Sequence, residues 1–260
     1  QHGLELFSQY HDNVVKVPLG IDPAQWHPTE RTPPEDEFRF LTCGSDLRKG
    51  TDLAHWAFKT VFPDPDRLSP RPRLVMKGAP SERYTGPGVA TISGRLSQED
   101  EQALYASCHV YLAPSRGEGF GLQPLQAMAQ GMPTILTDAH GHADFADLAI
   151  PLPWAWSPAD YFIYGHAGDW WEPDFEALCE AMWDTYQNYE AHLVAAGFVA
   201  ETIIPKRWTW DLTARRYMDA LGDPLNAPAL DGPGYHVSTY KRYLVRVVRR
   251  WKADIGGTMY

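Results

Sequence analysis

HVYLAPSRGEGFGLQPLQAMAQGMPTILTD, residues 109–138, is the stretch that decides the fold. The apolar runs at 109–113 and 134–137 are typical of buried strands. Between them lie a turn-rich segment, 114–121, with three glycines in five residues, and a helical stretch, 122–130. This order predicts a strand–loop–helix–strand unit. Ligands of such units bind outside the carboxyl ends of the strands, and phosphates favour the N-terminus of the helix. A phosphorylated ligand is therefore expected at this loop.

Strands and helices alternate along the preceding part of the chain as well. Ser97 and Asp100 form a capping box, S-x-x-D, at the start of one helix. This alternation is typical of an α/β fold, a Rossmann-like parallel sheet with helices on both faces. No Gly-x-Gly-x-x-Gly follows the first strand of the domain, which argues against an ordinary dinucleotide-binding dehydrogenase. The expected strands are 14–17, 38–43, 74–77 and 89–92, and the expected helices are 51–62 and 98–107.

The C-terminal half begins with an aromatic segment, PLPWAWSPADYFIYGHAGDWWEPD (151–174), which has no clear periodicity. We expect an ordered loop there, because so many rings rarely stay in water. Helices are expected at 175–189 and 208–221, followed by a Pro- and Gly-containing linker at 222–234. A final amphipathic helix, 238–252, carries six Lys and Arg residues and no acid. Two uses of this helix stay open: contact with an anionic membrane surface, or packing of its apolar stripe against the acidic body or a partner protein.

Length, net charge and cysteine positions limit the classes to which the protein can belong. The 260 residues are enough for one large or two small domains. A net charge of −10 argues that the chain as a whole is no nucleic-acid binder. Cys43, Cys108 and Cys179 lie far apart and fit neither a metal site nor a disulfide framework, so free thiols in a reducing, cytoplasmic setting are expected. No apolar run approaches the ~18 residues of a membrane span, and no signal peptide is found.

The glycine-rich loop offers groups suited to a sugar diphosphate. Glu118 and Gln126 lie eight residues apart and flank the GFGL sequence. A carboxylate suits sugar hydroxyls and a side-chain amide suits ribose hydroxyls. The backbone amides of 119–122 suit phosphate, because glycine allows close approach. The alternative is a glycine-rich connection with a solvated acid. His140 and His142 form an H-x-H pair. No third ligand is nearby, so a metal is not expected, and a sugar contact and plain loop structure stay open.

PSRGEGFGLQPLQAMAQGMPTILTD (114–138) resembles the Glu-x7-Glu segment of retaining glycosyltransferases of the GT-B fold, family 4. The likeness covers roughly residues 13–221 and includes several motifs in the family's order. These are VPLGIDPAQWHP (17–28), GSDLRKG (44–50), LVMKG (74–78), ISGRLSQEDEQALYASCHVYLAPS (92–115) and WTWDLTARRYMDAL (208–221).

This resemblance implies a Rossmann-like domain that binds a nucleotide-sugar donor, UDP- or GDP-linked, with no metal and no other cofactor. Glu118 would contact the hydroxyls of the donor sugar and Lys49 would bind the diphosphate, so these two are the expected catalytic residues. Gln126 would stand where the family has a Glu that binds both ribose hydroxyls. The other expected donor contacts are Gly44, Ser45, Arg48, Arg95, Leu96, Gly119, Phe120, Gly121 and Leu122.

The chain departs from the family pattern in three ways. Gln126 lacks the charge that would strengthen bonds to ribose. Ser45 stands where the family commonly has Arg, and Arg48 either supplies that charge or is a surface residue. Enzymes of this fold place the active site between two Rossmann-like domains, whereas this chain starts, at Gln1, at the linker between them. It is therefore expected to be the donor-binding half, with the acceptor half removed, on a separate chain or absent.

The expected division is a linker at 1–37, the donor-binding domain at 38–221, a second linker at 222–234 and a basic amphipathic tail at 235–260. The expected function is transfer of a hexose-type sugar, with retention, to an unknown hydroxyl acceptor. Expected partners are the nucleotide-sugar, a separate acceptor domain or a second copy of the chain, and a membrane surface if residues 238–252 bind lipid. The alternative is a degenerate domain that serves as a non-catalytic binding or assembly module.

Overall fold

The computed structural model describes residues 2–80, 82–161 and 165–221. The chain divides into two compact units, Gln1–Thr213 and Ala214–Tyr260. The described part of the second unit, 214–221, is helical. The predicted linker at 222–234 and the predicted tail helix at 238–252 lie outside the described residues. No helix in the described ranges is both long and apolar enough to cross a membrane.

The first unit is built on a six-stranded sheet in the order β3-β2-β1-β4-β5-β6, in which every neighbouring pair is parallel. This is the strand order of a Rossmann fold, so the predicted fold class is confirmed. The chain reverses its direction of travel across the sheet between β1 and β4, where Phe40 lies opposite Val110 and Thr42 opposite Leu112. The strands are β1 Glu37–Cys43, β2 Arg71–Lys77, β3 Val89–Ile92, β4 Val110–Ala113, β5 Thr134–Thr137 and β6 Ile150–Leu152.

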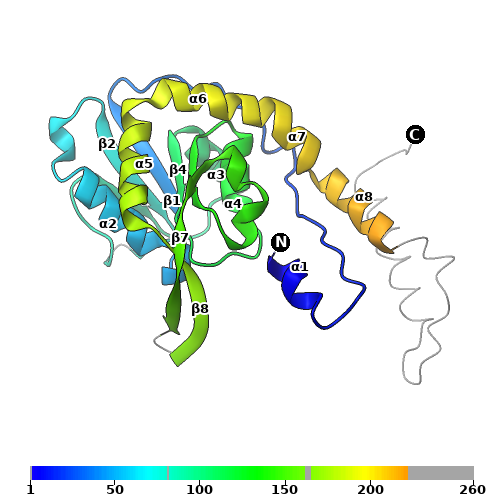
Figure 1. Ribbon diagram of the computed structural model, residues 1–260. Coiled ribbons are helices and arrows are strands. Elements are labelled where there is room, and N and C mark those ends of the chain that lie inside the picture. Colours follow the sequence, from blue (N-terminus) through cyan, green and yellow to red (C-terminus); the bar gives the residue numbers. More distant parts are fainter. Residues whose placement is uncertain (1, 81, 162–164, 222–260) are drawn as a thin grey trace. The chain divides into compact units, whose positions relative to one another are not determined.

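Helices cover both faces of the sheet (Figure 1), because successive side chains of each strand point to opposite faces. Phe40 of β1 belongs to one buried cluster, which includes Phe58 from α2 (Thr51–Val61) and Met182 from α5 (Phe175–Gln187). The next residue, Leu41, belongs to the other, which includes side chains of α3 (Gln98–Ala106) and α4 (Leu122–Ala129). Because both faces are covered, the strands of this sheet read as continuous apolar runs.

The local signals that predicted the helices are visible in the structure. Ser97 caps α3, and its Oγ accepts a hydrogen bond from the Asp100 amide at 3.1 Å, as the capping box predicts. The predicted helix at 175–189 ends at Gln187, and a second helix that the sequence did not indicate, α6, follows at once. The remaining helical elements are α1 His2–Phe7, α6 Tyr189–Phe198, a π-helical turn Val199–Ile203, α7 Ile204–Arg207 and α8 Trp210–Leu221.

Two sequence predictions are wrong. Residues 14–17 form no strand; the segment leads toward Ile21, which makes an isolated parallel bridge with Thr209. The aromatic segment is no loop. It contains β6 and then an antiparallel hairpin of β7 (Trp154–Tyr161) and β8 (Gly165–Pro173), which projects from the six-stranded sheet (Figure 1). Cross-strand pairing of rings, Trp156 opposite Trp171, stabilises such a hairpin and orders this segment.

Candidate functional site

Two loops meet where the strand order reverses. One loop follows β1 and spans 44–50; the other follows β4 and spans 114–121. In open α/β sheets the crevice at this reversal, outside the carboxyl ends of the strands, is the usual ligand site. The first loop carries Arg48 and Lys49, and the second carries Glu118. The topology therefore brings residues 70 positions apart in the sequence to one edge of the sheet.

The two loops are in direct contact. Gly50 has a φ of 66°, and a Cβ at this position would lie 1.8 Å from the carbonyl oxygen of Pro114, so only glycine fits. The Ser115 hydroxyl donates to the carbonyl oxygen of Arg48 at 3.0 Å, and the Arg116 amide donates to the same oxygen at 2.7 Å. The backbone of one loop is thus fixed against the backbone of the other.

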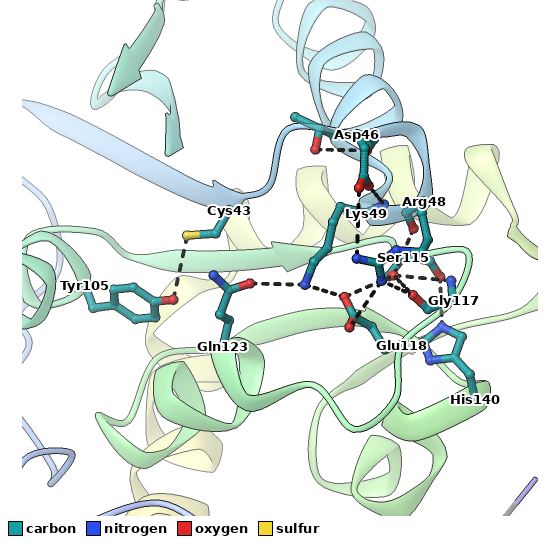
Figure 2. Close-up of polar contacts among 11 residues, drawn as sticks. Cys43, Asp46, Arg48, Lys49, Tyr105, Ser115, Gly117, Glu118, Gln123 and His140 are labelled. Carbon is teal, nitrogen blue, oxygen red and sulfur yellow. Dashed lines mark hydrogen bonds and ion pairs between the residues drawn. The ribbon is translucent and has the colours of Figure 1, made fainter. Parts of the chain in front are cut away.

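Glu118 lies between two cations (Figure 2). Its Oε1 is 2.5 Å from Lys49 Nζ, and its Oε2 is 3.4 Å from Arg48 Nη1. Arg48 Nη1 also donates to the carbonyl oxygen of Gly117 at 2.5 Å, and Lys49 Nζ donates to Gln123 Oε1 at 3.2 Å. The Glu118 carboxylate is 12% exposed, whereas Lys49 is 23% and Arg48 38% exposed. The cations therefore remain within reach of a ligand from solvent.

A cavity of about 500 Å³ opens beside Glu118. Gly119 is exposed, and a Cβ there would meet no atom within 4 Å, so its backbone is open to a ligand. Gly141 also lines the cavity and packs against the same loop: its amide donates to the carbonyl oxygen of Glu118 at 3.0 Å, and a Cβ there would lie 2.5 Å from the Phe120 backbone. The other lining residues are Leu4, Lys16, Val17, Pro18, Leu19, Phe120, His140, Asp144 and Trp171.

His140 and His142 support the glycine-rich loop from beneath. His140 has a φ of 46°, and its Nε2 lies 3.0 Å from the carbonyl oxygen of Ser115. Burial lowers the pKa of His140 to about 4 and lowers that of His142 well below its ordinary value. A Cβ on Gly121 would lie 2.5 Å from the His142 ring. Both imidazoles are therefore neutral near pH 7, and His140 also lines the cavity. Among the described residues, no group of three or more His, Cys, Asp and Glu could hold a metal ion.

The remaining predicted residues lie near the same edge of the sheet and differ in solvent exposure. Gly44 has a φ of 150° and packs against the Lys49 side chain, while Ser45 is exposed. Gln126 is half-buried on α4. Arg95 is exposed and Leu96 half-buried on the connection between β3 and α3.

Sequence reasoning missed two residues of this region, Gln123 and Arg116. Gln123 accepts a hydrogen bond from Lys49 and directly follows the GFGL sequence at 119–122, so its position next to that motif was a usable signal. Arg116 is 5% exposed and forms bidentate ion pairs with Asp52 of α2 (2.8 and 3.1 Å) and with Glu172 of β8 (2.5 and 2.8 Å). Its Nη1 also donates to the carbonyl oxygen of Leu47. Burial acts against the charge, but the bonds to Glu172 and Asp52 raise the pKa of Arg116 above its ordinary value.

Comparison with known proteins places this geometry in a family. The family model described as "Family 4 Glycosyltransferase in conflict systems" matches residues 3–217. The chain belongs to this family. The loop pair that holds Lys49 and Glu118 is therefore the loop pair of a family 4 glycosyltransferase.

Several known proteins are similar in sequence to part of this family 4 glycosyltransferase. A putative glycosyltransferase of Sulfolobus islandicus filamentous virus is 40% identical over 70 residues, which are 27% of this chain and 20% of the virus protein. The lipopolysaccharide core biosynthesis mannosyltransferase LpsB of Rhizobium meliloti is 32% identical over 137 residues, 48% of this chain and 34% of LpsB. The matches thus span about a third or less of these relatives.

A solved structure supports the fold independently. Sucrose-phosphate synthase from Thermosynechococcus elongatus aligns with a TM-score of 0.60 at 18% identity, covering 82% of this chain and 54% of the synthase. At that identity the likeness concerns the fold of the domain. The family membership and the fold agree with the resemblance inferred from the motifs.

Proposed function

We propose that this chain is the donor-binding half of a retaining glycosyltransferase that moves a hexose-type sugar from a UDP- or GDP-sugar to a hydroxyl acceptor. The observation that carries the proposal is the Lys49–Glu118 ion pair, 2.5 Å long, at the strand-order reversal and beside a cavity of about 500 Å³. The mannosyltransferase relative supports a hexose as the transferred group. Membership of a glycosyltransferase family supports catalysis of a transfer reaction rather than ligand binding alone.

The ion pair suggests how the donor binds. A diphosphate that enters the crevice competes with Glu118 for Lys49 and Arg48, because both cations are partly exposed. Once they turn to the diphosphate, Glu118 gains free acceptor oxygens for the hydroxyls of the donor sugar. The open backbone of Gly119 offers a further contact at the same wall. Ligand binding thus exchanges one set of charge-assisted bonds for another.

The same groups account for transfer. The bond between the anomeric carbon and the diphosphate oxygen breaks, and the negative charge that develops on the leaving oxygen is stabilised by Lys49 and Arg48. Glu118 holds the sugar in position for attack. The acceptor oxygen bonds to the anomeric carbon on the face that the diphosphate leaves, and the acceptor proton passes to a phosphate oxygen. Configuration is thereby retained.

Calorimetry with UDP, GDP and ADP tests the proposal on the full chain. We expect UDP or GDP to bind, and Glu118→Ala to weaken the matching nucleotide-sugar more than the free nucleotide. Glu180→Ala, an exposed acid on α5, is the matched control and should change neither affinity. Absence of nucleotide binding at millimolar concentration would overturn the donor function. Equal loss of nucleotide and nucleotide-sugar would remove Glu118 from the sugar-binding role.

A non-catalytic binding or assembly module is the second candidate function. Gln126 stands where the family motif has the Glu that binds ribose, which favours weaker nucleotide binding. Restoring the acid separates the two functions. Under the enzyme proposal, Gln126→Glu strengthens binding of UDP or GDP; under the module proposal, neither the native chain nor this variant binds a nucleotide.

A further inference from the structure

Three tryptophans form one face of the hairpin. Trp154 and Trp156 are two residues apart on β7, so their side chains share a face, and Trp171 lies opposite Trp156 on β8. The ring centroids of Trp156 and Trp171 are 4.9 Å apart, and those of Trp154 and Trp156 are 5.2 Å apart. Trp156 is 58% and Trp154 36% exposed. We call these three residues the tryptophan face.

The tryptophan face is held in a fixed orientation. The indole Nε1 of Trp154 donates to the carbonyl oxygen of Asp138 at 2.7 Å, which ties β7 to the end of β5. Glu172, next to Trp171, is bound by the buried Arg116. Large aromatic rings exposed together on a rigid frame are typical of a binding surface. Such a frame lowers the entropy lost when a ligand binds.

The tryptophan face continues from the cavity beside Glu118. Trp171 lines that cavity together with Glu118 and Gly119. Its ring packs edge-on against His140, with centroids 5.6 Å apart. A ligand bound next to a sugar on Glu118 therefore reaches Trp171 first and Trp156 next.

Charge and shape select the ligand. The polar side chains that line the cavity with Trp171 are Glu118, Asp144, His140 and Lys16, and Lys16 is paired with Asp144. The chain's net charge of −10 disfavours anionic ligands such as nucleic acid. An indole ring suits a flat, uncharged surface, such as the C–H face of a pyranose, while carboxylates accept hydrogen bonds from its hydroxyls.

We infer that the tryptophan face binds the acceptor, a neutral carbohydrate whose pyranose ring stacks on Trp156 and Trp171. The inference rests on the proposed function, because the acceptor must lie next to the donor sugar. It assigns part of acceptor recognition to the hairpin of this chain. Donor binding stays with the loops that follow β1 and β4, which carry Lys49, Arg48 and Glu118.

Saturation-transfer NMR on the full chain tests the inference with four neutral probes: the methyl α-pyranosides of glucose, mannose and galactose, and maltotriose. We expect at least one probe to receive saturation at its ring C–H protons. Trp156→Ala should weaken binding of that probe about 5- to 150-fold, the range of a lost aromatic stack. Trp183→Ala is the matched control, because Trp183 is 44% exposed on α5 and belongs to no part of the tryptophan face. This control should leave binding unchanged.

Three outcomes would overturn the inference: no probe binds, both tryptophan variants weaken binding equally, or a single-stranded oligothymidine binds through Trp156 instead. Calorimetry with UDP and GDP on Trp156→Ala separates this inference from the proposed function. Nucleotide affinity that survives while pyranoside affinity falls supports an acceptor surface distinct from the donor site. Pyranoside binding through Trp156 in a chain that binds no nucleotide overturns the donor function and the acceptor role, and leaves a carbohydrate-binding hairpin.

Discussion

Two ion clusters each draw a residue from the loop that follows β4, Arg116 in one and Glu118 in the other, and they differ in how completely their charges are paired. Arg116 is buried, and its two carboxylate partners take both edges of its guanidinium. Glu118, two residues later, faces the partly exposed cations Lys49 and Arg48 across a cavity. The pairing chemistry is alike, Arg or Lys with Asp or Glu. The side chains of Arg116 and Asp52 are only 6% and 5% exposed, and Glu172 alone is partly open to solvent at 32%, whereas both cations of the Glu118 cluster are partly exposed.

This difference separates stability from binding. A closed cluster holds its elements together, and breaking it leaves charges buried without partners. An open cluster contributes little to stability because water screens it, yet its cations can turn to a ligand. We therefore expect mutations in the Arg116 cluster to change folding and mutations in the Glu118 cluster to change affinity.

The largest expected effect tests the closed cluster. Arg116→Met should lower the free energy of unfolding by about 3–5 kcal/mol, because it leaves Asp52, 3% exposed, without its counter-charge. Urea unfolding followed by circular dichroism measures the change. Arg67→Met removes an 85% exposed guanidinium paired with Asp64 and is the matched control, expected within about 1 kcal/mol of the native chain. Similar losses of unfolding free energy in the two variants would contradict the structural role of the Arg116 cluster.

The second prediction tests the open cluster. Lys49→Ala should weaken UDP or GDP binding by about 1.5–3 kcal/mol, the size of a hydrogen bond to a charged group, and should lower stability by under about 1 kcal/mol. Calorimetry and urea unfolding measure the two effects. Lys59→Ala removes an exposed lysine of α2 and should change neither. A large loss of stability at Lys49 would show that the open cluster is structural.

The third prediction concerns the walls of the cavity. Gly141→Ala should destabilise the protein by about 1–3 kcal/mol, because the new methyl group would lie 2.5 Å from the Phe120 backbone. Gly119→Ala adds the same methyl group where no atom lies within 4 Å, so it should leave the melting temperature within error. Thermal unfolding of both variants provides the measurement. Equal shifts would contradict the packing of Gly141 against the loop.

The fourth prediction is a pH dependence of stability that arises from His140, which packs against the glycine-rich loop. Burial lowers the pKa of His140 in the folded protein to about 4, below the ordinary value of 6.5 that applies to the unfolded chain. As the pH falls below 6.5 the unfolded chain binds this proton first, so stability is lost between pH 6.5 and about 4. His140→Asn keeps a residue that tolerates a positive φ and removes the titrating group. It should reduce the slope of stability against pH by about 1.4 kcal/mol per pH unit.

Urea unfolding at half-unit pH steps, on the native chain and on His140→Asn, measures this slope. The half-buried His109 and the buried His142, whose pKa values are also lowered by burial, remain in both proteins and contribute to the residual slope. Identical slopes in the two proteins would show that folding does not lower the pKa of His140.

Much of the fold could be predicted because its signals are local. Strands buried on both faces appear as continuous apolar runs. The start of α3 is marked by the capping box of Ser97 and Asp100, which lies within four consecutive residues. Parallel strands also place their following loops at one edge, which is why Lys49 and Glu118, both assigned to the donor site by the motif resemblance, lie together. The motif resemblance added the family, which the comparison confirms.

What the sequence did not predict depends on pairing across long separations. The partners of Arg116 lie 64 residues before it and 56 after it, and no local pattern links them. The hairpin of β7 and β8 was hidden because the bulge between Pro158 and Asp160 interrupts the alternation of its side chains. The W-x-W spacing at Trp154 and Trp156 was the one local sign of a strand there.

The hairpin also leaves the sheet and returns to it at nearly the same point, since the Asp174 amide donates to the carbonyl oxygen of Pro153 at 2.8 Å. A segment closed in this way can be lengthened, shortened or exchanged without moving the end of β6 or the start of α5. If its tryptophans bind the acceptor, new acceptor preferences can arise by replacing residues of this segment other than Glu172, the partner of Arg116, while the proposed donor-binding loops are inherited unchanged.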